Sequence, residues 1–322
     1  MSKQYSAIVH SLTPFNEKYE LDENALRLHL RRLCAAGVSV YLGAAGASEG
    51  YTLTRDERNR VLAVAVEELK GKVPVRAAGV EPRDAAEMSA YLRDAEAIKV
   101  DAAQIYSLDM GHGLIPSRRE LEGYFRAAIE ATSLPVIISN QKKVGYALPL
   151  DLVEQLAARY SNFVGFAYDV NDAFYMIELL QRLGGRLEIH CSGTENALFT
   201  LGMGGNGYQG MEGNIAPKLA ATVVSAFVAK DMDLMHESFR KLMQLRAILR
   251  GPVRSNQRAA KALLNAYELS GGIVRPPRLP VSPEELDDVI KAVQLLEIPE
   301  MASWQLRKTP GTSNPGRTSA TH

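Results

Sequence analysis

One pattern constrains the fold of this chain more than any other: a strand followed by a helix, repeated eight times before residue 230. Each unit begins with a short apolar run that ends in polar residues or glycine, and continues with apolar residues at helical spacing. The expected strands cover 6–12, 38–44, 73–80, 102–107, 134–140, 163–169, 187–193 and 207–211, and the expected helices cover 22–36, 54–69, 82–98, 117–131, 149–159, 173–183, 195–201 and 217–229. No Gly-rich phosphate-binding fingerprint follows a strand, so the pattern predicts an α/β protein with a closed (β/α)8 TIM barrel.

The strand pattern stops near residue 231, and three helical patterns follow at 231–249, 258–269 and 283–296. We therefore expect three parts: a barrel over 1–230, a C-terminal helical region over 231–304 packed on the barrel, and a mobile tail over 305–322, which has almost no apolar residues. The segment 270–281 is rich in glycine and proline, which predicts a bend lying against the barrel or against a partner chain.

Composition limits the kinds of partner. The 322 residues carry a formal net charge of zero, so no basic surface for nucleic acid or an anionic membrane is expected. The chain has no apolar run of about 20 residues, the length that spans a bilayer, and no signal peptide at its start. Cys34 and Cys191 lack the spacing of a metal site or a disulfide framework, which favours a reducing compartment. We expect a cytoplasmic protein without metal or cofactor.

The chemistry of such barrels lies where the strands end. In the sixth expected strand, FVGFAYD, side chains alternate, so Gly165, Ala167 and Asp169 share one face. This face of small residues ending in a carboxylate either accommodates large neighbours or leaves space for a ligand.

Polar residues at the ends of the strands complete the set of candidates. The candidate acids and bases are Asp169, Tyr106, Glu49 and His112; the candidate substrate-binding residues are Ser48, Ser139, Asn140, Ala167, Gly193 and Gln209. Simpler interpretations remain open: the loop GAAGASEG can be a plain glycine-rich turn, His112 a solvated loop residue, and Cys191 a core residue.

Several short motifs occur together in a familiar order. LTPF (12–15), YTLTRDER (51–58), IISN (137–140), CSGTE (191–195) and GNIAP (213–217) resemble the dihydrodipicolinate synthase and N-acetylneuraminate lyase family over about residues 5–300. The resemblance implies a barrel with a C-terminal helical region, a homotetramer built from dimers, and a 2-oxo acid such as pyruvate as substrate. It also implies a Schiff base between a lysine of the sixth strand and the keto carbon, assisted by a tyrosine of the fifth strand.

The sequence departs from this family at the residues that the reaction needs. Ala167 stands at the position of the lysine and Ser139 at that of the tyrosine; the paired threonines fall among Ala44, Ala45 and Ala47, with Ser48 the nearest hydroxyl. Alanine cannot form an imine. Several losses together indicate natural divergence, although an engineered replacement of the lysine alone would leave the same alanine. The nearest amines are Lys142 and Lys143, just beyond the fifth strand.

Three functions fit these residues. The favoured hypothesis is a lyase, of the aldolase or the dehydratase kind, that acts on a 2-oxo acid or related carbonyl compound by acid–base chemistry without the imine. The alternatives are an aldolase with a relocated lysine and a non-catalytic homologue that binds a small ligand. The apolar, proline-rich stretch 273–281 and the resemblance both predict a homotetramer or at least a dimer.

Overall fold

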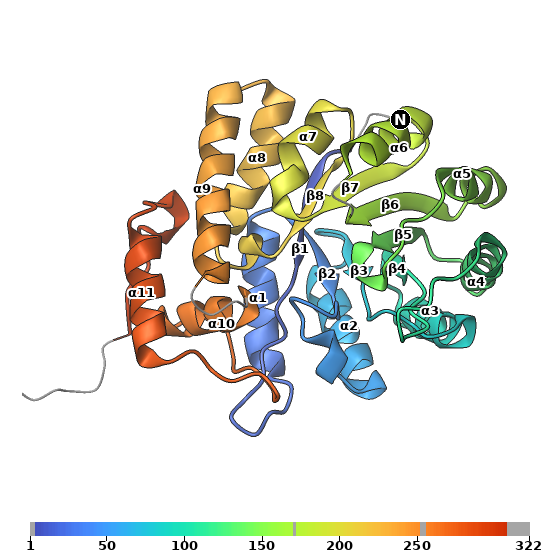
Figure 1. Ribbon diagram of the computed structural model, residues 1–322. Coiled ribbons are helices and arrows are strands. Elements are labelled where there is room, and N and C mark those ends of the chain that lie inside the picture. The colour runs from blue at the N-terminus through green and yellow to red at the C-terminus, as the bar shows by residue number, and fades with distance from the viewer. Residues whose placement is uncertain (1–3, 170–171, 252–255, 308–322) are drawn as a thin grey trace, which may run out of the picture.

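The computed structural model describes residues 4–169, 172–251 and 256–307, and its centre is a closed barrel of eight parallel strands (Figure 1). The strands follow one another around the barrel in chain order, and β8 pairs with β1. They are β1 Ser6–His10, β2 Ser39–Leu42, β3 Val75–Ala77, β4 Ala102–Tyr106, β5 Val136–Gln141, β6 Phe163–Asp169, β7 Glu188–Ser192 and β8 Gly207–Gly210. The predicted (β/α)8 TIM barrel is confirmed.

Helices connect the strands and cover the outside of the barrel (Figure 1). They are α1 Glu23–Ala35, α2 Arg55–Leu69, α3 Ala85–Ile98, α4 Arg118–Glu130, α5 Leu150–Arg159, α6 Ala173–Leu183, α7 Ala197–Gly202 and α8 Pro217–Ala229. Local sequence sets several of their starts, because Thr54 and Ser117 each form a capping box with the glutamate three residues later.

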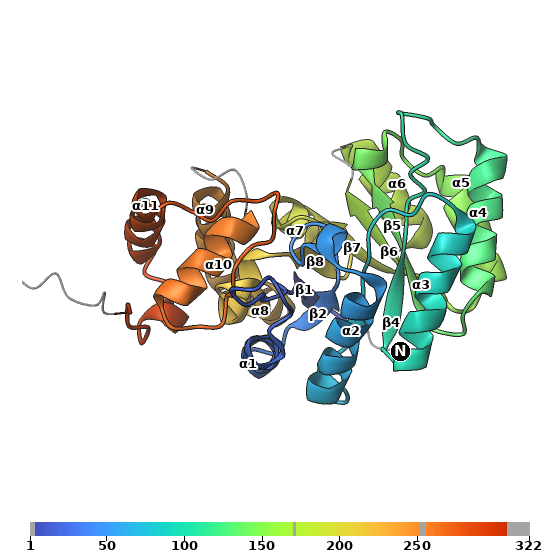
Figure 2. The ribbon, with the colours of Figure 1, turned by 90° about the horizontal axis from the view of Figure 1, so that it is seen from below.

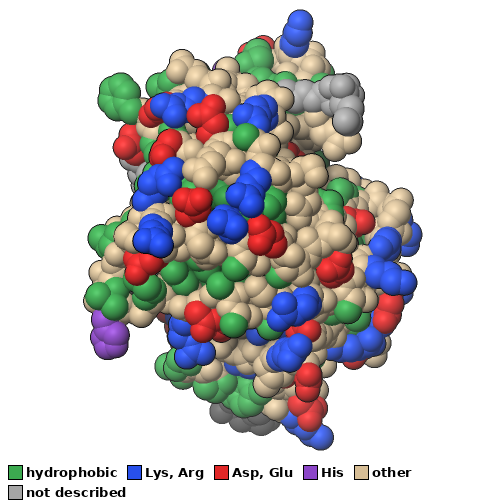
Figure 3. All heavy atoms as spheres, turned by 90° about the vertical axis from the view of Figure 1, so that its right-hand side faces the viewer, with side chains coloured by type: hydrophobic (Ala, Val, Ile, Leu, Met, Phe, Trp, Pro, Cys, Tyr) green, Lys and Arg blue, Asp and Glu red, His purple; other side chains and the backbone are tan. Residues whose placement is uncertain are grey.

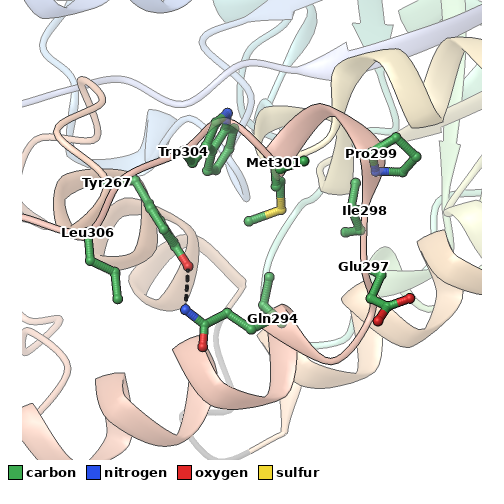
Figure 4. Close-up of a pocket in the computed structure, with 10 residues that line it drawn as sticks. Tyr267, Gln294, Glu297, Ile298, Pro299, Met301, Trp304 and Leu306 are labelled. Carbon is green, nitrogen blue, oxygen red and sulfur yellow. Dashed lines mark hydrogen bonds between the residues drawn. The ribbon is translucent and has the colours of Figure 1, made fainter.

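The C-terminal region adds α9 Met232–Arg250, α10 Asn256–Ala266 and α11 Pro283–Gln294 on one side of the barrel (Figures 1 and 2). A hollow of about 470 Å³ lies between the ends of α10 and α11 and the last described turn (Figure 4). The ring of Trp304 packs 5.3 Å from that of Tyr267, and the Arg307 N–H donates to the Ala266 carbonyl at 2.7 Å. Arg307, inside the expected tail, is thus tied to the end of α10, whereas 308–322 lie outside the described residues.

The strands separate two layers of side chains. On β6, Phe166 and Tyr168 belong to the large apolar core between strands and helices, whereas Ala167 packs inside the barrel with Ala102 and Ile137. The outer layer is almost entirely apolar, as a buried parallel sheet requires. The inside of the barrel, in contrast, holds many polar side chains: His10, Arg76, Gln104, Ser139, His190 and Gln209.

The segment 270–281 has a definite place in the single chain. Ile273 bridges to Phe15, and Arg275 donates to the Thr52 carbonyl and to Glu57, each at 3.0 Å. Through Ile273 and Arg275 the segment lies against the barrel, which is one of the two positions expected for it. Leu279 alone among its large apolar side chains is strongly exposed, at 73%.

Beneath this segment lies a buried ion pair. Lys261 of α10, 1% exposed, donates to the carboxylate of Glu49 in the loop after β2, and its ammonium lies 4.5 Å from the centroid of the Phe15 ring. Burial lowers the pKa of Lys261 to about 8, although Glu49 opposes the shift. We call Lys261, Glu49, Phe15 and Arg275 the C-terminal clamp, since they join the last helices to the first two strand ends.

The surface carries both signs of charge. On the face seen in Figure 3, basic and acidic side chains are interspersed. Within the described part of the chain, none of the helices has the length and apolar character needed to cross a membrane.

Candidate active site inside the barrel

Ala167 stands in the middle of β6 with its methyl group inside the barrel. It is fully buried, and its neighbours in register are Ser139 on β5 and His190 on β7. A register shift after Val136 aligns Ile137 with Gly165 and so brings Ser139 beside Ala167. The eight strands contain no lysine.

Asp169 ends the same strand, two residues further toward the mouth, which we define as the end of the barrel where the strands finish. It is half-buried and lies in register with Gln141 of β5. Gln141 in turn donates from its side-chain amide to the Ser139 hydroxyl at 2.5 Å. A carboxylate, an amide and a hydroxyl therefore meet along β5 and β6 above Ala167.

Three further polar side chains form what we call the mouth cluster: His10 of β1, Gln104 of β4 and Gln209 of β8. The side-chain oxygen of Gln209 lies 3.2 Å from Nε2 of His10 and 3.4 Å from the amide nitrogen of Gln104. The His10 ring stacks on Tyr41, with centroids 5.3 Å apart. Burial lowers the pKa of His10 to about 4, while Gln209 and Glu212 raise it more weakly and Lys143 lowers it further. The imidazole is thus neutral near pH 7.

Asn214 holds the end of β1 in place. Its amide nitrogen donates to the His10 carbonyl at 2.8 Å, and its oxygen accepts from the Leu12 N–H at 3.0 Å and lies 2.9 Å from Nε2 of His29. All these bonds are buried or nearly so, so the backbone that carries His10 has little freedom.

At the opposite end, which we call the floor, lies a second polar group. Arg76 donates to Glu188 at 2.8 Å, and His190 contacts Ser6 through Nε2 at 2.9 Å and Glu188 through Nδ1 at 3.5 Å. Burial would raise the pKa of Glu188, but Arg76 and His190 hold it below its usual value. We call Ser6, Arg76, Glu188 and His190 the floor cluster.

Tyr106 also points into the barrel. It packs with Ile8, Tyr41 and Ala78, and burial raises its pKa far above the usual value. The phenol therefore keeps its proton and can act only as a hydrogen-bond donor or acceptor.

Three candidates have side chains that make contacts away from the centre of the barrel. The carboxylate of Glu49 is occupied by Lys261 and the Arg275 N–H, and the Ser48 hydroxyl donates to the Ser11 carbonyl at 2.6 Å. Asn140 donates to the Tyr175 hydroxyl and accepts from the Leu148 N–H, each at 3.2 Å, so it supports the loop before α5. These side chains hold loops in place.

Two further candidates lie in loops at the mouth. His112 is exposed, with a φ of 53° between two glycines that also have positive φ. Gly193 has a φ of 116°, and a Cβ there would lie 2.7 Å from the Glu195 carboxylate. Glycine at 193 is thus required by the fit of Glu195, which binds Arg246 of α9.

Sequence reasoning missed His10, Gln104 and Tyr41. The signal was available, because the alternation used for the sixth strand also places Ile8 and His10 on one face of the first strand. Cys191, in contrast, belongs to the outer core, and burial raises its pKa to about 12. Among the residues that the structure describes, no group of three His, Cys, Asp or Glu side chains could hold a metal ion.

Comparison with known proteins agrees with this architecture. The model of the dihydrodipicolinate synthetase family matches residues 3–296. A 4-hydroxy-tetrahydrodipicolinate synthase of Methanopyrus kandleri is 29% identical over 286 residues, which cover 87% of this chain and 92% of the relative. A probable 5-dehydro-4-deoxyglucarate dehydratase of Methylobacterium radiotolerans is 31% identical over 273 residues, 83% and 86% of the two chains.

Solved structures show the same fold. The crystal structure of dihydrodipicolinate synthase from Thermotoga maritima superposes with a TM-score of 0.83 at 19% identity, covering 92% of this chain and 99% of that one. The enzyme DapA-2 from Bacillus anthracis gives a TM-score of 0.82 at 21% identity, over 91% and 99%. Together with the family match, these likenesses lead to one conclusion: the chain belongs to the dihydrodipicolinate synthetase family and is an enzyme of its lyase type.

Proposed function

We propose that this lyase cleaves a carbon–carbon or carbon–oxygen bond in a 2-oxo acid or related small carbonyl compound without a lysine Schiff base. The observation that carries the proposal is Ala167, whose methyl group lies inside the barrel against Ala102 and Ile137. Because the strands contain no lysine, the barrel wall offers no amine for an imine. Relatives named as synthases and as dehydratases support both kinds of bond cleavage.

The mouth supplies groups for acid–base chemistry. Asp169 exchanges a proton with the substrate, while Ser139, Gln141 and Gln209 bind its oxygen atoms. Tyr106 contributes at most a hydrogen bond, and His112 and Gly193 remain candidates at the rim. Without an iminium ion, the 2-oxo group itself takes up the electrons of the broken bond.

Borohydride trapping tests the central claim. Incubation with pyruvate and borohydride should leave the mass of the protein unchanged, as intact-protein mass spectrometry would show. A gain of one reduced pyruvate would reject the imine-free mechanism. Lys143 is then the first residue to map by peptide analysis, since its charge acts on His10; the side chain of Lys142 lies outside the described residues.

Ala167→Lys separates a natural alanine from an engineered one. In a naturally divergent site the new lysine should bring neither trapping nor turnover, because Ser139 is too short to relay protons as a tyrosine does. Recovery of both together would show that a lysine had been removed. Turnover of any 2-oxo acid by the unmodified chain, followed by product analysis, distinguishes an enzyme from a non-catalytic binder.

Assembly and location are part of the same proposal. We expect a homotetramer or dimer, supported by the family and by the exposed Leu279; light scattering that gives 35.2 kDa at micromolar concentration would refute it. Cys34 and Cys191 are both free thiols, which supports a cytoplasmic location.

A further inference from the structure

We infer that His10 is the second acid–base group of this site, that it accepts the substrate's proton at Nδ1, and that Gln104 and Gln209 fix the tautomer that makes this possible. The inference rests on the proposed function and adds to it a residue, an atom and two positioning side chains.

The hydrogen bonds of the mouth cluster select the tautomer. The Gln104 amide nitrogen is a donor, so the Gln209 oxygen 3.4 Å away is the acceptor that it meets. The same oxygen lies 3.2 Å from Nε2 of His10. A carbonyl oxygen can accept twice but cannot donate, so Nε2 of His10 carries the proton. In a neutral ring, Nδ1 is then left with a lone pair.

That lone pair has no protein partner. Nδ1 of His10 is buried and makes no hydrogen bond to any described residue, and the same is true of the Gln104 side-chain oxygen. Buried polar atoms are nearly always paired, so an unpaired one in a barrel interior calls for a ligand. His10 as a residue is only half-buried, so it lies close to the surface at the mouth of the barrel.

The surrounding charges suit an acceptor that becomes active when substrate binds. The neighbours of the ring are Tyr41 on its face, Gln209 at Nε2, and at longer range Glu212 and Lys143. A substrate carboxylate would add negative charge and offset Lys143. The added negative charge and the offset of Lys143 both favour the imidazolium, so they raise the pKa of His10. His10 is therefore a stronger base only while the ligand is present.

The proton transfer balances without a further reactant. In an elimination, Nδ1 takes the proton from the carbon beside the 2-oxo group, and the C–H electrons form the new double bond as hydroxide leaves. The imidazolium returns the proton to the hydroxide, which departs as water. In carbon–carbon cleavage the proton comes from the hydroxyl group and returns to the enolate carbon. In both cases His10 ends neutral.

Proton exchange in D2O tests this role with a defined probe. The wild-type chain should exchange the C3 protons of pyruvate or 2-oxobutyrate, followed by proton NMR, and His10→Gln should slow the exchange by about a hundredfold or more. His190→Gln is the matched control: it removes a buried histidine whose two nitrogens both have partners, and it should exchange near the wild-type rate. An equal rate in wild type and His10→Gln would overturn the inference and leave the proposed function standing. No exchange by the wild type would overturn both.

Nitrogen-15 NMR of histidine-labelled protein tests the positioning role without substrate. The His10 signals, assigned by their loss in His10→Gln, should show the proton on Nε2 and an unprotonated Nδ1 at pH 7. Gln104→Leu should give a mixture of tautomers and a changed pH profile of exchange. A proton on Nδ1 in the wild type, or an unchanged tautomer in Gln104→Leu, would refute the assignment.

Discussion

The mouth and the floor of the barrel each contain a histidine, and the two differ in their hydrogen-bond partners. Burial lowers the pKa of both His10 and His190 to about 4. At the floor, both nitrogens of His190 have partners, Ser6 and Glu188; at the mouth, only one nitrogen of His10 has a partner. The comparison teaches that burial and a shifted pKa do not by themselves identify a reactive group. What separates His10 from His190 is the unsatisfied Nδ1 atom inside the barrel.

The two ends also differ in charge. The floor pairs a cation with an anion, Arg76 with Glu188, whereas the mouth cluster consists of neutral side chains. Removing one member of a buried ion pair leaves an uncompensated charge, while neutral groups with open hydrogen-bonding positions leave room for a ligand. Changes at the floor should therefore alter stability, and changes at the mouth should alter activity.

The largest expected effect is at the floor. Arg76→Met should lower the free energy of unfolding by about 3 kcal/mol, because Glu188 would remain partly buried without its cation. Urea denaturation measures the loss of stability. The rate at which each folded molecule exchanges the C3 protons of pyruvate in D2O should not change. A free energy of unfolding within 1 kcal/mol of wild type would show that water solvates the Glu188 carboxylate in place of the arginine. The floor would then depend less on its ion pair than proposed.

At the mouth, Asp169→Asn should reduce turnover by about a hundredfold, or about 2.7 kcal/mol in barrier height, if the carboxylate exchanges a proton with the substrate. The urea midpoint should stay near that of wild type. Activity within threefold of wild type would remove Asp169 from the site and leave His10 as its principal base.

Acid sensitivity gives the next effect. The folded-state pKa of His190, about 4, lies below its unfolded value of 6.5, so the unfolded chain binds more protons between these values and stability falls as the pH falls. Between pH 6.5 and 5, His190 should account for a loss of up to about 1.4 kcal/mol in the free energy of unfolding per pH unit, and His190→Gln should remove this loss. This pH range lies above the one in which Glu188 titrates. Urea unfolding at several pH values measures the slope, and an unchanged slope would mean that His190 is already charged.

The smallest effect should come from Tyr41, which lies between the two ends. Its hydroxyl is buried and makes no hydrogen bond of normal geometry, although Arg76 and Gln104 are near it. Tyr41→Phe keeps the ring that stacks on His10 and should change stability by less than about 1 kcal/mol. A larger loss, seen in thermal unfolding, would show that the hydroxyl couples the floor to the mouth.

The sequence was sufficient for the barrel, since apolar runs, caps and breaks act locally. It also placed Ala167 and Asp169 on one face of β6, and the same alternation would have found His10. For Ser139 and Asn140 the rule was not applied strictly: neighbours on a strand face opposite sides, so only one of the two can point inward.

The contacts of the loop side chains could not be predicted from strand alternation. Glu49 was expected to be an acid or base, yet its direction depends on Lys261, which lies 212 residues later in the sequence. The partners of Ser48 and Gly193 are likewise set by how loops pack together. No local pattern encodes contacts of this kind.

The C-terminal clamp has a consequence for synthesis in the cell. The loop after β2 leaves the ribosome early, but the lysine that neutralises Glu49 follows 212 residues later. At about 5–20 residues per second, the nascent chain carries this unpaired carboxylate for about 10–40 s. The first strands can pair during that interval, yet the loop above them can reach its final position only after Lys261 has been synthesised. The synthesis of α10 therefore sets when the loop after β2 finishes folding.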